Sequence, residues 1–179
     1  VGRTSSNAIA QVGMAAPTID LSNLSLPSNA KGVAVDSINE RIFWTSGDFI
    51  GVVNLDGTGL NDTLITLDPG AGASGIAVDA SGGFIYWAQT NLPGSGGIMR
   101  ANLDGTNVVP IVSRGGASDV AIDLVNSKLY HSSETSFDIG RCDLNGDNND
   151  NDYFAGLGGG AGVTGITGIA VDTVNGYLY

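Results

Sequence analysis

An acidic, amide-rich stretch over residues 143–152 is the part of the sequence best suited to chemistry. Asp143, Asn145 and Asp147 alternate within it, which places side-chain oxygens at the first, third and fifth positions of a tight loop. Ca²⁺ prefers oxygen ligands, and loops with this spacing often hold it. The twelfth position, where such loops carry an acidic residue, is Phe154. The stretch therefore predicts either a calcium site, which is the only cofactor suggested, or a lengthened hairpin turn.

Residues for nucleophilic or general-base catalysis are scarce. The chain has one histidine, His131, and one cysteine, Cys142. Both occupy repeat positions that elsewhere hold packing side chains, so we expect a strand histidine and an inert buried thiol. The two glutamates, Glu40 and Glu134, fall in a turn and after a strand. We therefore expect no enzyme; the alternative is a lactonase-like hydrolase with a carboxylate-bound metal in a central channel.

A repeated segment ending in aspartate defines the elements that position these residues. Asp36, Asp79, Asp123 and Asp172 close four copies of it and lie 43, 44 and 49 residues apart. Six residues after each one begins an apolar–aromatic pair, so a turn of fixed length joins two strands. The asparagine and glycine in these turns favour a type I′ hairpin. We expect each aspartate to accept turn N–H groups, with a ring of carboxylates around an axis as the alternative.

Each repeat continues with two more strands. A third apolar strand is expected at Ile50–Leu55, Ile98–Leu103 and Ile139–Leu144, and a weaker fourth strand follows, as at Leu64–Leu67. Because the strands carry apolar residues on both faces, we expect each sheet to be covered on both sides. Four-stranded antiparallel sheets stacked around an axis meet that requirement. The predicted fold is all-β: a β-propeller with about four blades' worth of strands.

The strands divide into three complete blades and two halves. We expect the third and fourth strands of a split blade at 1–31, complete blades at 32–74, 75–118 and 119–167, and the first two strands of a split blade at 168–179. The halves could close within the chain, pair between chains into a ring or fibre, or belong to a longer receptor-like binding propeller. The apolar residues expected at such a joint are Ile9, Val12, Met14, Ile19, Leu21, Ile169, Val171, Leu178 and Tyr179.

The aromatic segments show a family resemblance. Residues 43–46, 86–89 and 130–133 read FWTS, YWAQ and YHSS. With the repeated AVD and NLDGT segments, they resemble degenerate repeats of the low-density-lipoprotein-receptor class B (YWTD-type) propeller, in a bacterial-type secreted version. The resemblance covers residues 32–179, although the final Asp of the motif and the usual six blades are missing. It implies a propeller with a non-enzymatic, extracellular interaction role and carries no particular ligand.

Composition limits the partners. The 179 residues include 28 glycines, 7 basic and 18 acidic residues, for a net charge of −11. Nucleic acid and anionic membranes are therefore poor partners, and no apolar run is long enough to span a membrane. We expect a second copy of the chain or another extracellular protein as partner, and an extracellular or cell-surface location. Asn23 and Asn61 begin sequons that are candidate glycosylation sites.

Overall fold

The computed structural model describes residues 27–90, 96–157 and 165–179. These residues form 14 strands and no helix. The strands build three four-stranded antiparallel sheets and one two-stranded sheet, each in chain order. The expected all-β fold with four-stranded antiparallel blades is confirmed.

Each sheet is a simple meander. Blade 1 contains β1 (Ala30–Asp36), β2 (Arg41–Ser46), β3 (Phe49–Asn54) and β4 (Asn61–Thr66). Blade 2 contains β5 (Ala73–Asp79), β6 (Phe84–Gln89), β7 (Gly97–Asn102) and β8 (Val109–Ser113). Blade 3 contains β9 (Ala117–Asp123), β10 (Lys128–Ser133), β11 (Ile139–Asp143) and β12 (Asp150–Phe154). The half-blade contains β13 (Val171–Asp172) and β14 (Tyr177–Leu178).

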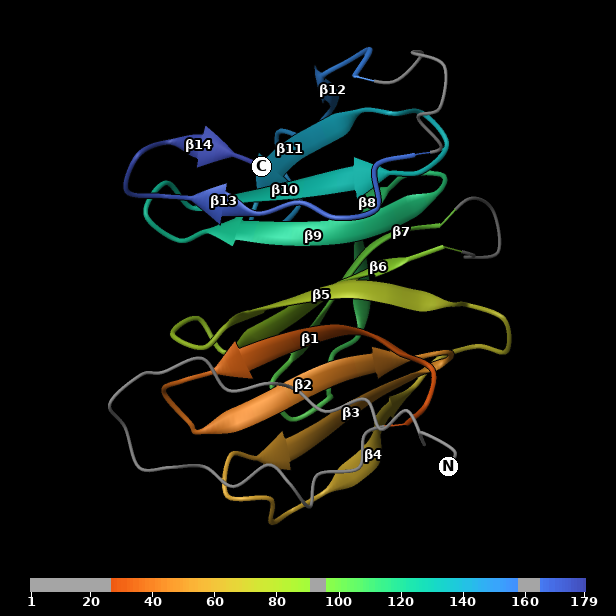
Figure 1. The fold of residues 1–179 in the computed structure, drawn as a ribbon, viewed down its shortest axis with the longest axis vertical. Coiled ribbons are helices and arrows are strands. Elements are labelled where there is room, and N and C mark those ends of the chain that lie inside the picture. The colour runs from red at the N-terminus through yellow and green to blue at the C-terminus, as the bar shows by residue number, and fades with distance from the viewer. Residues whose placement is uncertain (1–26, 91–95, 158–164) are drawn as a thin grey trace, which may run out of the picture.

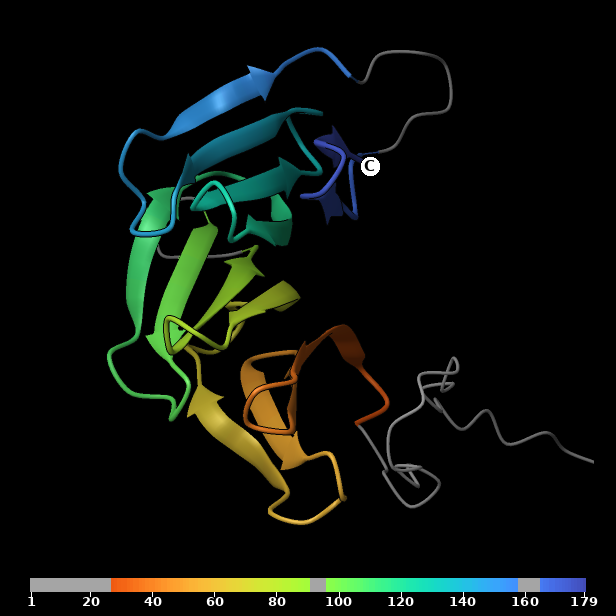
Figure 2. The same ribbon diagram turned by 90° about the vertical axis from the view of Figure 1, so that its left-hand side faces the viewer.

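The blades follow one another in an arc. The first strands of successive blades, β1, β5, β9 and β13, contact one another in that order and lie side by side through the middle of the molecule (Figure 1). The last strands, β4, β8 and β12, lie on the convex side of the arc (Figure 2). Blade 1 and the half-blade occupy its two ends.

The turn between the first two strands of each blade corrects one expectation. A type I′ turn requires positive φ at two consecutive residues. Here only the second residue of each expected pair has it: Glu40 at 54°, Gly83 at 83°, Ser127 at 53° and Gly176 at 73°. The aspartate side chain stabilises this wider turn instead. The Asp36 carboxylate accepts the Asn39 N–H at 2.9 Å, and the other repeated aspartates accept equivalent N–H groups. Their expected capping role is confirmed.

The core lies between the blades. Phe43 and Ile65 of blade 1 pack with Ile85 and Trp87 of blade 2, and a second cluster joins blades 2 and 3. Trp44 and Trp87 are both fully buried. The outer strands depart from the expectation of cover on both faces, because β4, β8 and β12 are largely exposed. They form the rim of the arc, where only part of each strand meets the neighbouring blade.

A tryptophan in β2 and a histidine in β10 occupy equivalent positions, each opposite a glycine. Trp44 pairs with Gly51, and His131 pairs with Gly140. A Cβ atom on either glycine would lie within 2.2 Å of the facing ring. The glycines therefore make room for large flat side chains across the strand pair. No helix among the described residues is long and apolar enough to cross a membrane.

Candidate functional site

At one end of the arc, two valines of β1 are exposed, although Ile42, Trp44 and Val53 of the same blade are buried. Val33 and Val35 on β1 are 49% and 55% exposed. The residues equivalent to Val33, Ile76 on β5 and Val120 on β9, are only 6% and 4% exposed. Ile76 packs in the core shared with blade 1, which precedes it. Val33 and Val35 therefore mark the face that a blade presents to its predecessor.

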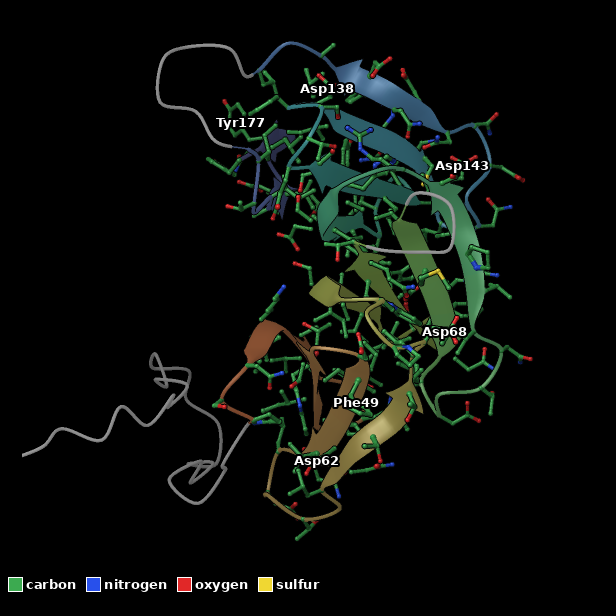
Figure 3. The ribbon with its side chains drawn as sticks, turned by 90° about the vertical axis from the view of Figure 1, so that its right-hand side faces the viewer. Phe49, Asp62, Asp68, Asp138, Asp143 and Tyr177 are labelled. Carbon is green, nitrogen blue, oxygen red and sulfur yellow. The ribbon has the colours of Figure 1, made fainter. Side chains whose placement is uncertain are left out.

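The other end carries a groove beside the half-blade. A cavity of about 480 Å³ is lined by side chains of blade 3, including Tyr130, Tyr153 and Phe154, and by Tyr177 and Leu178 of the half-blade. The Tyr130 and Tyr153 ring centroids are 6.0 Å apart. Figure 3 shows Tyr177 on the half-blade at this end of the arc. The groove is thus an aromatic surface in the place where a complete neighbouring blade would pack.

The β14 strand has a backbone edge suited to a further strand. Ala170 and Tyr179 exchange two backbone hydrogen bonds, of 3.0 and 2.8 Å. Such pairs alternate along an antiparallel ladder, so the N–H and C=O of Leu178 point away from β13. The strands equivalent to β14 in the three complete blades each pair with a third strand on that side.

A half-buried carboxylate attaches the half-blade to blade 3. Asp119 on β9 accepts the N–H groups of Ile169 and Val120, both at 2.9 Å, and the Ser118 hydroxyl donates to the Ile166 carbonyl at 2.6 Å. Burial raises the pKa of Asp119, and the two N–H groups only partly offset that effect. Asp119 is not among the site residues predicted from the sequence. The signal was its place in the repeat, because the other three copies have glycine there.

The expected calcium residues lie in the turn between β11 and β12, on the convex side of the arc (Figure 3). The Asp143 carboxylate accepts hydrogen bonds from the Lys128 ammonium and, at 2.6 Å, from the Asn148 amide. These hydrogen bonds lower the pKa of Asp143. Asn145 and Asp147 bond to each other, with the Asp147 N–H donating to Asn145 Oδ1 at 3.0 Å.

The same turn geometry recurs in the other blades. Asp56 with Thr58, and Asp104 with Thr106, make the equivalent hydrogen bond between the side chain and the backbone. Among the described residues, no group of three or more His, Cys, Asp and Glu side chains is arranged to hold a metal ion. The predicted calcium ligands include the amide oxygen of Asn145, which is not one of these four residue types. Calcium binding at Asp143, Asn145 and Asp147 therefore stays a prediction.

His131 and Cys142 are buried strand residues, as expected. His131 is fully buried with its Nε2 atom 3.0 Å from Asn149 Oδ1. Burial, assisted by the nearby Arg114 charge, lowers the His131 pKa to about 4. Burial also raises the pKa of Cys142 to about 12, so its thiol stays protonated and unreactive.

The residues expected at a joint between half-blades fall into two groups. Ile9, Val12, Met14, Ile19 and Leu21, together with the sequon residue Asn23, lie outside the described residues. Ile169, Val171 and Leu178 are half-buried on the half-blade, and Tyr179 is exposed. Asn61 is exposed at the start of β4, where its side chain accepts the Thr63 N–H.

Comparisons with solved structures agree with the blade architecture. A chain in the crystal structure of a nidogen/laminin complex matches with a TM-score of 0.61 and 25% identity, over 68% of this chain and 46% of that one. The putative TolB of Agrobacterium tumefaciens matches with a TM-score of 0.55 and 20% identity, over 70% of this chain and 48% of that one. The fold is a β-propeller fold, and this chain spans about half the length of each of these structures.

Sequence comparisons do not narrow the assignment beyond the β-propeller fold. No protein-family model matches the chain. A curated protein of Cochliobolus heterostrophus, the 3-hydroxyacyl-CoA dehydrogenase-like protein LAM1, is 33% identical over 79 residues. The match covers 41% of this chain and only 17% of that protein. The propeller fold and the two ends of the arc are therefore the features that bear on function.

Proposed function

We propose that this chain is a non-catalytic, extracellular β-propeller module of the YWTD type that acts as a structural or protein-interaction subunit. The observation that carries the proposal is the apolar surface at the two ends of the arc, formed by the exposed Val33 and Val35 of β1 and by the groove at Tyr130. Apolar surface of this kind marks protein contact sites. The similarity to a chain of a nidogen/laminin complex supports a protein partner, and the net charge of −11 disfavours nucleic acid.

The two faces are complementary, which makes a second copy a suitable partner. Val33 and Val35 lie on the face that a blade presents to its predecessor, while the groove at Tyr130 lies on the face presented to a successor. We propose that two copies meet end to end through Val33 and Val35 of one copy and the groove at Tyr130 of the other. This contact uses different surfaces on each copy, so it produces a ring where the rotation closes and a fibre where it does not.

Sedimentation velocity across micromolar concentrations tests this assembly. The wild-type chain should associate as its concentration rises, and Val35→Asp should shift it strongly towards monomer, because the substitution places a charge in the apolar contact. Val174→Asp is the matched control, since Val174 is 90% exposed in a turn of the half-blade. A wild-type chain that stays monomeric throughout, with Val35→Asp unchanged from it, would contradict self-assembly.

A propeller hydrolase is the second candidate, and Asp119 is the observation that favours it. This carboxylate lines a polar cavity of about 300 Å³ between the first strands of the blades, together with Lys31 and Ser118. Its oxygens already accept two backbone N–H groups, which supports a structural role. Lactones and phosphoesters should show no turnover with added divalent metals. Turnover that Asp119→Asn abolishes would overturn the non-catalytic proposal.

A further inference from the structure

We propose that the turn face of the arc binds another protein through a partner surface that is both apolar and positively charged. The turn face consists of the turns that join the first strand to the second and the third strand to the fourth in each blade. These turns are residues 37–40, 80–83, 124–127 and 173–176, and residues 55–60, 103–108 and 144–149. The inference rests on the proposed protein-interaction role and adds the surface and the chemistry of the partner.

All of these turns lie on one side of the molecule, because each blade is an antiparallel meander in chain order. The first and third strands of such a sheet run in the same direction and therefore end on the same side. The arrowheads of β1, β9 and β13 point to the left-hand side of Figure 1, where the chain turns back into β2, β10 and β14. Figure 2 is viewed towards this side. The turns of successive blades thus form one face.

The turn face carries aliphatic side chains at repeated positions. Ile38, Val125 and Val174 each follow the repeated aspartate by two residues, and they are 65%, 74% and 90% exposed. Val125 belongs to blade 3, which contacts blade 2 on one side and the half-blade on the other, so its exposure does not come from an end of the arc. Leu60 and Val108, at equivalent places in two of the other turns, are also exposed. Apolar surface exposed in this way marks protein contact sites.

Blade 2 shows that the turn between the first two strands does not need an aliphatic residue. Its residue at the same position is Ser81, whose hydroxyl donates to Asp79 Oδ1 at 2.8 Å. The Gly82 N–H donates to the same oxygen at 2.7 Å, and this is the hydrogen bond that the Asn126 N–H makes to Asp123 in blade 3. Serine is a common turn residue for this reason. Folding of the turn therefore does not explain the aliphatic residues of the other blades, whereas contact with a partner does.

The charges of the turn face determine which partner fits it. The turn segments contain no Lys, Arg or His, and their four acidic residues are exposed: Glu40, Asp56, Asp104 and Asp147. Asp56 and Asp104 accept both side-chain hydrogen bonds of their turns through Oδ1, so Oδ2 takes no part in the turn. Lys and Arg of a partner can pair with these carboxylates, whereas a second copy would bring the same acidic face and be repelled. The partner is therefore a different protein with basic and apolar residues on one surface.

Peptide selection on the full chain tests this surface. The triple variant Ile38→Ser, Val125→Ser, Val174→Ser introduces the residue that blade 2 already has, so we expect it to fold as the wild type does. A random peptide library displayed on phage is first depleted on the triple variant and then selected on the wild-type chain. We expect the enriched peptides to combine Lys or Arg with large apolar residues.

The most enriched peptide is then synthesised, and its affinity is measured by fluorescence anisotropy. The triple variant should bind it about tenfold more weakly than the wild type. Asp56→Asn combined with Asp104→Asn should also weaken binding, and so should added salt, which screens the exposed carboxylates. Phe49→Ser is the matched control, since Phe49 is 39% exposed at the start of β3, on the side opposite the turn face. It should leave the affinity unchanged.

Circular dichroism and the urea midpoint of each variant should match those of the wild type. The inference is overturned if no peptide is enriched, if the enriched peptides lack basic residues, or if Phe49→Ser weakens binding as much as the triple variant does. A triple variant that fails to fold would also overturn it, because the aliphatic residues would then be needed by the turns themselves. None of these results changes the sedimentation of Val35→Asp, so failure of the inference and failure of the proposed self-association are distinguishable.

Discussion

Phe43 in blade 1 and Tyr130 in blade 3 occupy the same position in the repeat, yet their surroundings differ. Phe43 is fully buried in the core shared with blade 2. Tyr130 is half-buried and lines the groove beside the half-blade. Both lie in second strands of complete blades. The comparison shows that a blade supplies the same face each time, and that the blade following it determines whether this face is core or surface.

The largest expected effect comes from a substitution in the core between blades 1 and 2. Trp87→Ala should lower the free energy of unfolding by about 3–5 kcal/mol, because it removes a fully buried ring and leaves a cavity. Tyr130→Ala, in the groove beside the half-blade, should lower the free energy of unfolding of the isolated chain by less than about half of that amount. Urea unfolding followed by circular dichroism measures both. Equal losses would mean that the two interfaces do not differ as described.

The second prediction concerns pH and compares His131 with Trp44 at equivalent positions. The His131 pKa falls to about 4 in the folded state, from an ordinary value of 6.5. The unfolded chain therefore binds more protons between these values, so stability should decrease as pH falls from about 6.5 to 4, by up to about 3 kcal/mol.

His131→Trp provides the control for that pH effect. Gly140 offers the space that Gly51 offers to Trp44, so the larger ring should fit. The variant should unfold with little dependence on pH between 6.5 and 4, in contrast to the wild type. If both proteins have the same pH profile in urea unfolding, His131 does not titrate as proposed.

A smaller and more local effect is expected at the open end. Asp119→Ala removes the acceptor of the Ile169 and Val120 N–H groups, which should cost about 1–3 kcal/mol. The loss should concentrate in the half-blade, because Asp119 attaches it to blade 3. Hydrogen exchange should show faster exchange at residues 169–179 and unchanged exchange in β5–β7. Uniform acceleration in all blades would contradict a local attachment.

The smallest expected effect separates the long β11–β12 turn from the shorter turns in blades 1 and 2. If Asp143, Asn145 and Asp147 bind Ca²⁺, the melting temperature should rise with calcium and fall with EDTA. At a calcium concentration tenfold above Kd, binding should add about 1.4 kcal/mol to the free energy of unfolding. Asp147→Asn should abolish the response, whereas Asp104→Asn in blade 2 should retain it. A melting curve that EDTA leaves unchanged would identify the stretch as a turn only.

Several features were predictable because they depend on local periodicity. The repeated aspartate, the apolar–aromatic pair and the glycine-containing turns located the strands to within a few residues; β3 begins at Phe49, one residue before the expected Ile50. The packing positions of His131 and Cys142 also followed from their places in the repeat. These features depend on strand alternation and turn chemistry, which act over a few residues.

Other features depended on contacts between distant residues. The sequence alone determined that the chain forms four-stranded antiparallel blades and which side chains each blade contributes. Only the tertiary structure decided that Val33 is exposed while Ile76 is buried, although both open the same repeated apolar segment. It also decided that Asp119 attaches the half-blade through Ile169, 50 residues along the chain. Burial and hydrogen bonding at these positions depend on which blade packs beside them, and local sequence does not encode the presence of that neighbour.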